Sequence, residues 1–325
     1  MSAPAKQPPG GEFQGSKRLR VEPGLPLAES LTAAFAGVIR YASEWAARAE
    51  LDPEPAVHNF RKSIRRGRAL LKLVRGHLAR DEYELLVEDL RGAMRETSAA
   101  RDADVLVALV AAYPRKPKTA PALDALQALL EERRSAVVQG RLGRAMREGA
   151  EQLGGLPPRL ESLLPAELSL TELREAVRVS YRRARRARLR AIESRDDDDV
   201  HAWRKRVKEL RYQVELLEPL TGHRPEHDLL AELAEHLGEV TDLVVMRDCL
   251  LAYEERLEGV NAAPLLEKLE KRIAKQQVLR LEEAATAFEA APRAFARHLL
   301  QGVGATRESG RLIAPQAPPA PPAEA

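Results

Sequence analysis

A cluster of positive charge follows a single histidine in the stretch VHNFRKSIRRGRALLK, residues 57–72, which contains no acidic residue. The histidine is His58, and the cations are Arg61, Lys62, Arg65, Arg66, Arg68 and Lys72. On a helix all of them except Arg66 share one stripe, with Arg68 at its edge. Like charges at this spacing repel one another and cost folding stability. A multivalent anion would remove that cost, and phosphate oxygens suit arginine forks particularly well.

A second copy of this stretch is VHAWRKRVKELRYQVELL, residues 200–217, in which His201 matches His58 and Trp203 matches Phe60. The stripe of the second copy consists of His201, Arg204, Lys205 and Lys208, with Arg211 at its margin. Each histidine, and the free backbone amides at the start of each helix, could donate hydrogen bonds to phosphate. The two stretches together therefore predict one phosphate site with two matching parts.

The elements that position these residues are predicted to be long helices. Leucine, alanine and valine recur at helical spacing, and no stretch alternates as a β-strand does. The pattern indicates an all-α fold, a tandem duplication of a four-helix bundle. Its halves are about 27–154 and 166–303, joined by LGGLPPRLESLLP (153–165). The predicted helices are 27–50, 55–75, 81–112 and 121–152, then 168–193, 198–218, 225–258 and 263–300.

A third basic segment, YRRARRARLRAIE (181–193), precedes the second histidine helix. Its apolar stripe places Arg182, Arg183 and Arg186 together on the opposite face. Arg183 matches Arg40 in the repeat, so these two are the stronger candidates for phosphate contacts. The alternative is that the segment is only an exposed, arginine-rich surface.

Acidic residues near the histidine helices raise the question of a metal site. Asp196 to Asp199 lie just before the second histidine helix, where capping and the helix dipole favour carboxylates, and we prefer that role. Asp102 and Asp242 match in the repeat, and with Asp104 they would orient arginines through ion pairs or hold a metal. One histidine per half, without a second His or Cys at i+3 or i+4, is poor spacing for a metal. We therefore expect no metal and no other cofactor.

The composition sets wider limits. The chain has 325 residues, of which 44% are hydrophobic and 31% charged, enough for two ordinary domains or one large one. Lysine and arginine total 52 against 49 acidic residues, so the net charge of +3 does not by itself identify a polyanion binder. The single cysteine, Cys249, permits no intramolecular disulfide, and no apolar run suits a signal peptide or a membrane span. We expect a cytoplasmic protein without a membrane partner.

Both ends of the chain are rich in proline, glycine and alanine. Such composition favours disorder, so residues 1–26 and 304–325 are predicted to be disordered extensions. Within the first extension, the basic SKRLR (16–20) is predicted to be a solvated flank, or else a weak element for binding anionic surfaces.

The duplicated V-H-x-x-R-K-x-x-(R/K)-x-x-R helix, the LRY at 210–212, and the aspartates of ARDADVL and VTDL resemble the CHAD domain, the conserved histidine α-helical domain. The resemblance covers about residues 27–303. It implies two four-helix halves with pseudo-twofold symmetry and a basic groove or channel between them that binds inorganic polyphosphate. It also implies association with polyphosphate granules and their proteins. The contacts it implies are His58, Arg61, Lys62, Arg65 and Arg68, with His201, Arg204, Lys205, Lys208 and Arg211.

The second copy departs from the first at several positions. Glu209 stands opposite Arg66, so Arg66 is the cation that we least expect to touch a ligand. Thr241 takes the place of Arg101 in the third helix, which makes that helix a weaker copy. Many CHAD proteins carry a fused triphosphate-tunnel domain with an alternating-glutamate signature. Residues 1–26 do not contain it, so the hydrolase activity of such fusions is not expected here.

Binding without catalysis is the function that these residues predict, because the chain lacks a glycine-rich phosphate loop, a nucleophile elbow and an HExxH motif. One alternative is a nucleic-acid binder, which would need accessible stacking aromatics, and only Phe60 and Trp203 lie among the cations. Another is that His58 and His201 bind metal or accept phosphoryl groups, or simply cap or pack at their helix starts. A shared ligand requires the two histidine helices to face a common site.

Overall fold

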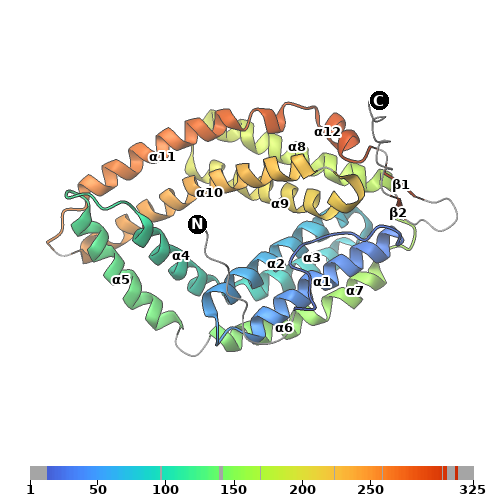
Figure 1. Cartoon of the computed structure of the whole chain (residues 1–325), viewed down its shortest axis with the longest axis horizontal. Helices are drawn as coiled ribbons and strands as arrows, with labels where there is room; N and C mark the ends of the chain where they lie inside the picture. Colours follow the sequence, from blue (N-terminus) through green and yellow to red (C-terminus); the bar gives the residue numbers. More distant parts are fainter. Residues whose placement is uncertain are drawn as a thin grey trace, which may run out of the picture.

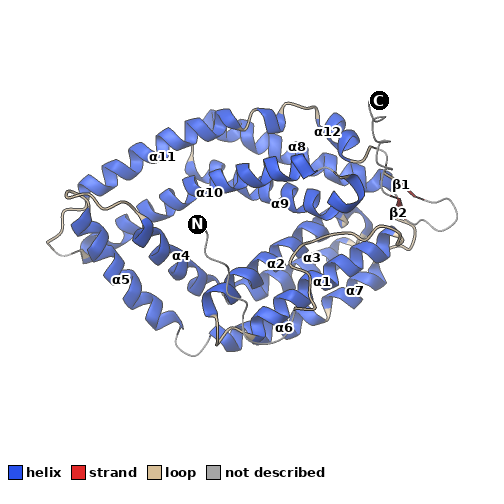
Figure 2. Ribbon diagram, viewed as in Figure 1, coloured by secondary structure: helices blue, strands red, loops and turns tan. Residues whose placement is uncertain are grey.

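The computed structural model describes residues 13–95, 97–138, 142–168, 170–222, 224–257, 259–301, 303–305 and 312–313. These residues are helical apart from loops and one antiparallel pair of two-residue strands, β1 (Gly304–Ala305) and β2 (Leu312–Ile313) (Figure 2). The prediction of an all-α fold is thereby confirmed. Figure 1 shows the helices as an elongated assembly.

The first half of the chain contributes α1 to α7. They are α1 (Leu27–Ala47), α2 (Pro53–Leu73), the 3₁₀ turn η1 (Arg75–His77), α3 (Arg80–Arg95), α4 (Ser98–Ala112), α5 (Ala120–Val138), α6 (Leu142–Gly154) and α7 (Leu156–Leu163). The predicted helices 81–112 and 121–152 are thus each divided in two. The predicted linker 153–165 contains α7, because its prolines occupy the first turn, where proline fits a helix.

The second half contributes α8 to α12. They are α8 (Leu170–Ser194), α9 (Asp197–Thr221), α10 (Arg224–Tyr253), the 3₁₀ turn η2 (Glu254–Arg256), α11 (Ala263–Glu283), the 3₁₀ turn η3 (Thr286–Phe288) and α12 (Pro292–Leu299). The predicted helix 263–300 is wrong as a single element. It stops before η3, where Phe288 is buried, and a new helix starts at Pro292, since proline cannot continue a helix from upstream.

Buried apolar side chains form two clusters that join the two halves of the chain. The larger cluster connects α1, α2, α3, α6 and α7 with α8, α9 and the first part of α10. The smaller cluster connects α4 and α5 with the far part of α10 and with α11, at the left end of Figure 1. Leu123 and Leu126 of α5, for example, share this core with Leu265 and Leu269 of α11. Each fully buried leucine stabilises the fold by about 1.5–3 kcal/mol.

Helices α2 and α9, which carry the two histidine stretches, pack against each other in the middle of the molecule (Figure 1). Each buries one apolar stripe, formed by Val57, Phe60 and Ile64 in α2 and by Val200, Trp203 and Val207 in α9. The buried side-chain amide of Gln213 donates to the carbonyl of Ala69 at 3.2 Å across the contact. Phe60 lies beside Gly149 of α6, and Trp203 packs against Phe288 of η3. The buried stripes anchor both helices in the fold and leave their charged residues outside the apolar core.

Residues 13–26, predicted to be part of a disordered extension, lie instead on the helices. The side chains of Leu19 and Val21 are 0% and 2% exposed. The amide of Ser16 donates to the carbonyl of Gly37 in α1 at 2.8 Å, and the amide of Val21 donates to the carbonyl of Leu216 in α9 at 2.9 Å. The prediction was wrong here because apolar residues inside the basic segment fill buried positions. We call residues 13–21 the N-terminal strap. Residues 1–12 and 314–325 lie outside the described part.

No helix within the described ranges is long and apolar enough to cross a membrane. Cys249 is buried in the smaller core cluster. Burial raises the pKa of its thiol, as expected for a cysteine that serves as a small apolar residue.

Candidate functional site

The start of α9 is fixed by its own acidic residues. Asp196 is the N-cap, and its carboxylate accepts a hydrogen bond from the backbone amide of Asp198 at 2.8 Å. Asp197 accepts hydrogen bonds from Arg247 of α10 at 2.7 Å and from Gln277 of α11 at 2.5 Å. The capping role that we preferred is confirmed for Asp196. Among the described residues, no group of three or more His, Cys, Asp or Glu side chains could hold a metal ion.

Cations from α2 and α9 come together at the junction of the two helices. The pKa of Lys208 is lowered to about 7 by burial and by the charges of Arg204, Arg65 and Arg211. Arg65 belongs to α2 and the other three to α9, so both helices contribute to one concentration of like charge. The pKa of Lys62 is lowered to about 8 by burial and by cations of both helices. We call the following residues the cation cluster: Lys62, Arg65, Arg204, Lys208 and Arg211.

The two histidines lie beside the cation cluster. Burial lowers the pKa of His58 to about 4, and the charges of Arg101 and of cations on α2 and α9 act in the same direction. The pKa of His201 is also lowered, by burial and then by Lys205 and Arg204. Both rings are therefore mainly neutral at neutral pH in the free protein. A neutral imidazole can still donate one hydrogen bond to an anion.

Three arginines around the cluster carry a buried Nε atom without a hydrogen-bond partner among the described residues: Arg61, Arg204 and Arg211. A buried donor without an acceptor costs about 1–3 kcal/mol. The guanidinium of Arg204 also lies against Gly238 of α10, where an added Cβ would come within 3.0 Å of Nη2. Glycine at this position therefore leaves room for the guanidinium.

Aspartates on the neighbouring helices lie close to the arginines of both halves. Burial raises the pKa of Asp242 in α10, although the charge of Arg204 opposes the rise. In the first half, burial lowers the pKa of Arg61, and the negative charge of Asp102 in α4 opposes this lowering. The two aspartates matched by the repeat thus each lie near an arginine, as their predicted orienting role requires. Asp104 instead pairs with an arginine of α5, at 3.3 Å between Nε and Oδ1.

Comparison with known proteins agrees with this arrangement. The family profile described as the CHAD domain matches residues 30–251. The chain belongs to the CHAD domain family. The profile therefore includes both histidine helices and most of α10, whereas the N-terminal strap lies outside it.

Two solved structures share the fold of this CHAD protein. One is the crystal structure of the CHAD domain from the plant Ricinus communis, with a TM-score of 0.62 and 23% identity, covering 86% of this chain and 98% of that chain. The other is PptA from Streptomyces chartreusis, with a TM-score of 0.55 and 18% identity, covering 82% and 99%. At these identities the likeness concerns the fold alone. No curated protein sequence matches the chain.

Two cations of the first histidine helix are neutralised within the CHAD fold. Lys72, predicted to contact phosphate, is bound to Glu209 of α9 at 2.5 Å, and we remove it from the candidate site. Glu209 stands opposite Arg66 in the repeat, but in space its partner is Lys72. Arg66 is buried and pairs with Glu215 of α9 at 2.9 Å. The expectation that Arg66 is the cation least able to touch a ligand agrees with this burial.

Arg61, also a predicted contact, has a second role at the break between α3 and α4. Its Nη1 donates to the carbonyl of Met94 at 2.6 Å and to the hydroxyls of Thr97 and Ser98 at 3.2 and 3.0 Å. These bonds use one end of the guanidinium and stabilise the break that the sequence did not predict. The buried Nε remains without a partner.

The other predicted contacts differ in their exposure and in their distance from the cluster of this CHAD domain. Lys205, Arg40 and Arg186 are exposed, and Arg68, Arg182 and Arg183 are half-buried. Arg68 lies near Arg65 but also near Arg91 of α3, and Arg183 lies near Lys72. Among the described contacts, none connects Arg40 or Arg186 with the cluster. Their assignment to the site stays a prediction.

One residue that sequence analysis missed is Arg101 of α4. Its charge lowers the pKa of His58 and that of Arg65. The sequence marked this position only as one at which the two copies differ. No sequence signal pointed to it, because Arg101 lies in the first turns of α4, just after the helix break at Thr97 that the sequence did not predict.

Proposed function

We propose that this CHAD domain binds inorganic polyphosphate at the junction of α2 and α9 and does not transform it chemically. The observation that carries the proposal is the cation cluster, in which the pKa values of Lys62 and Lys208 are lowered to about 8 and about 7. Lowered lysine pKa values mean that the free protein holds these charges at a cost in free energy. A bound polyanion would offset that cost.

Polyphosphate has the chemistry that the cluster requires. It is a flexible chain with a negative charge on each unit, so one molecule can neutralise cations on both helices at once. Arginine forks bind phosphate oxygens in pairs, and the free Nε atoms of Arg204 and Arg211 offer donors for such contacts. Binding would release counterions from the polymer, and affinity should therefore fall steeply with salt.

The position of the aromatic residues favours polyphosphate over nucleic acid. Phe60, Trp203 and Tyr212, the aromatics within the two histidine stretches, are 0%, 0% and 4% exposed. They are unable to stack on bases, which is the contact that sequence-tolerant nucleic-acid binders use. Membership of the CHAD family, together with the basic helices, supports the phosphate polymer without bases.

The same proposal includes the internal duplication, with halves of about 27–154 and 166–303 and a basic groove or channel between them. Matched apolar positions in α2 and α9 are buried in both helices, which supports it. Val57 and Val200, and likewise Phe60 and Trp203, are buried. Two related helices that pack together at the centre of the fold would place their equivalent cations around one ligand.

Absence of catalysis is proposed from the character of the site. A histidine that accepts a phosphoryl group or binds a metal is usually oriented by a carboxylate or carbonyl partner on its other ring nitrogen. Within the described part of the chain, neither His58 nor His201 forms an ion pair with a carboxylate, although the charge of Asp198 acts on His201. Both rings are surrounded mainly by cations, which suits holding an anion in place. In the cell this function would place the protein in the cytoplasm at polyphosphate granules.

Isothermal titration of the purified chain with long-chain polyphosphate tests the proposal. We expect saturable binding that weakens as salt rises, with no release of orthophosphate during hours of incubation. RNA at equal phosphate concentration should fail to displace the polymer. Displacement by RNA would favour the nucleic-acid alternative, and orthophosphate release or acid-labile phosphohistidine would favour an enzyme.

A further inference from the structure

The N-terminal strap is fastened at several points to α1 and α9. Leu19 is fully buried, and its amide donates to Oε1 of Glu215 at 3.2 Å. Gly15 lies directly on α1, since an added Cβ would come within 2.1 Å of the backbone nitrogen of Tyr41. Phe13 packs against Trp45, with ring centroids 5.1 Å apart. The strap therefore has a fixed path across the fold.

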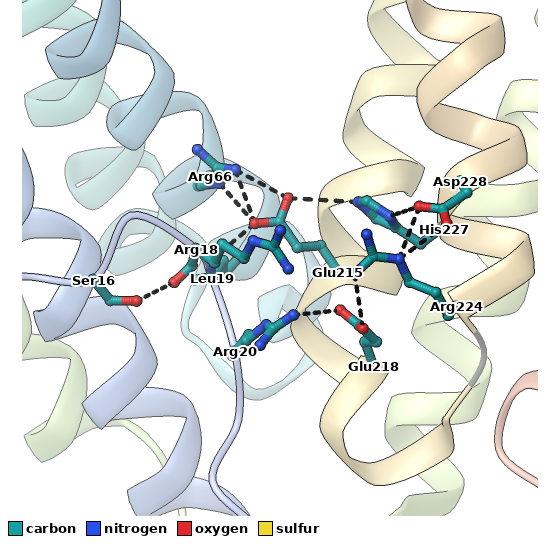
Figure 3. Close-up of polar contacts among 10 residues, drawn as sticks. All are labelled: Ser16, Arg18, Leu19, Arg20, Arg66, Glu215, Glu218, Arg224, His227 and Asp228. Atoms are coloured by element: carbon teal, nitrogen blue, oxygen red, sulfur yellow. Dashed lines mark hydrogen bonds and ion pairs between the residues drawn. The ribbon is translucent and has the colours of Figure 1, made fainter. Parts of the chain in front are cut away.

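The anchor of the strap is part of a network around the α2–α9 junction (Figure 3). Glu215 accepts hydrogen bonds from Arg66, and His227 of α10 lies 3.9 Å from its Oε2. The next residue of the strap after Leu19, Arg20, pairs with Glu218 of α9 at 2.8 Å. These contacts attach the strap to the same helix that supplies three of the five residues of the cation cluster.

Two cations of the strap remain available. Lys17 and Arg18 are exposed, and within the described residues no ion pair involves either side chain. They precede the buried Leu19 directly, so the anchoring of Leu19 at Glu215 also fixes their position beside the junction. The charge of Lys17 is near enough to Lys62 to contribute to the lowered pKa of that lysine.

We propose that the N-terminal strap is a third cationic element of the polyphosphate site, in which Lys17 and Arg18 contact the polymer beside the cation cluster. This inference rests on the proposed function and deepens it. The strap lies outside residues 30–251, which the CHAD profile matches. A polymer crossing the junction would then meet α2, α9 and the strap in turn.

Affinity for fluorescently labelled polyphosphate tests the inference in the full-length chain. The double variant Lys17→Gln/Arg18→Gln is compared with Lys116→Gln/Lys118→Gln, which removes two exposed charges from the α4–α5 connection at the left end of Figure 1. The strap variant should bind roughly 3- to 10-fold more weakly, with a log–log salt slope smaller by about one to two, and the control should bind like the parent. Equal melting temperatures show that the strap variant is folded.

Acetylation footprinting gives a second readout at the level of single residues. Lysines are acetylated with and without polyphosphate, and the modified sites are quantified by mass spectrometry. Protection of Lys17 together with Lys62, but not of Lys118, is the expected result. Protection of Lys62 with no protection of Lys17 and an unchanged affinity of the strap variant would overturn the inference and leave the proposed function standing. Absence of any binding would overturn both.

Discussion

The guanidinium of Arg66 and the carboxylate of Glu215 form a buried, doubly hydrogen-bonded pair that joins α2 to α9, with Nε and Nη2 of the arginine at 3.0 and 2.9 Å from Oε1. Burial alone would raise the pKa of Glu215, but the nearby imidazole of His227 and the charge and hydrogen bonds of Arg66 lower it to about 2. The carboxylate is therefore ionised throughout the physiological range. The pair joins the two basic helices, and its carboxylate also acts on the cation cluster, since the charge of Glu215 opposes the lowering of the pKa of Lys62.

Glu215→Gln should destabilise the fold strongly, because it leaves the charge of Arg66 buried without its partner. The expected loss in the free energy of unfolding is about 3–5 kcal/mol, measured by urea denaturation. Replacing both residues, as in Arg66→Met/Glu215→Leu, should recover much of that loss, since no buried charge remains.

An exposed ion pair supplies the control for this prediction. Glu267 and Lys271 lie 2.5 Å apart on the surface of α11, where solvent screens the pair, so Glu267→Gln should change stability far less than Glu215→Gln. A similar small effect for Glu215→Gln would mean that the pair is not a structural link between α2 and α9.

Gly238→Ala should weaken polyphosphate binding without destabilising the protein. The new methyl group would lie 3.0 Å from Nη2 of Arg204 and would displace the guanidinium from its present position. Alanine is also the better helix former by roughly 1 kcal/mol, so the melting temperature should stay equal or rise. Gly92→Ala in α3, where the nearest atom is at 3.7 Å, should give the same gain in stability with unchanged affinity. Equal affinity of both variants would show that the position of Arg204 is unimportant for binding.

Polyphosphate binding should take up protons. In the free protein at pH 8, Lys208 with a pKa of about 7 is largely neutral and Lys62 with a pKa of about 8 is half protonated. A bound polyanion raises both pKa values, so roughly one proton enters per molecule bound. Affinity should accordingly fall as the pH rises from about 6.5 to 9. Titration calorimetry in buffers of different ionisation enthalpy measures the uptake, and identical binding enthalpies in all buffers would refute it.

Lys208→Met should stabilise the free protein while it weakens binding. Folding lowers the pKa of Lys208 from 10.5 to about 7, so between these pH values the unfolded state binds more protons than the folded state. The cost of burying the charged ammonium group therefore lowers the free energy of unfolding fully below pH 7, and this cost disappears as the pH rises toward 10.5. Removing the charge should raise the free energy of unfolding by roughly 1–3 kcal/mol at pH 7, and the gain should shrink toward pH 10. Denaturation curves at the two pH values check the trend. A variant that is less stable than the parent at pH 7 would contradict it.

Much of the site could be predicted from sequence because it lies within single helices. The spacing of His58, Arg61, Lys62 and Arg65 is set by helix geometry, and the repeat at His201 identified its counterpart. The all-α class followed from composition and apolar periodicity. That α2 and α9 pack together depends on which apolar stripes meet in three dimensions, and periodicity does not specify partners.

The errors have identifiable physical causes. Lys72 was predicted to bind phosphate because it shares the stripe, but its neutralising partner, Glu209, lies on another helix. The divided helix 81–112 carries no proline or glycine at the break. Its break at Thr97 is stabilised by Arg61 from α2, a tertiary contact that local patterns do not contain. The strap was missed since its basic residues, within a terminal segment rich in proline and glycine, concealed the two apolar anchors, Leu19 and Val21.

The most direct test of the account is polyphosphate affinity and stoichiometry after one lysine is neutralised on each basic helix. Lys62→Gln, Lys205→Gln and their combination are compared with Lys116→Gln/Lys118→Gln by titration calorimetry at fixed salt and pH. The account predicts one short polyphosphate chain per protein, similar losses for the two single variants, and a combined loss of about tenfold or more that the control does not show. Unchanged affinity of the double variant, or two independent chains per protein, would contradict a single polyphosphate site shared by α2 and α9.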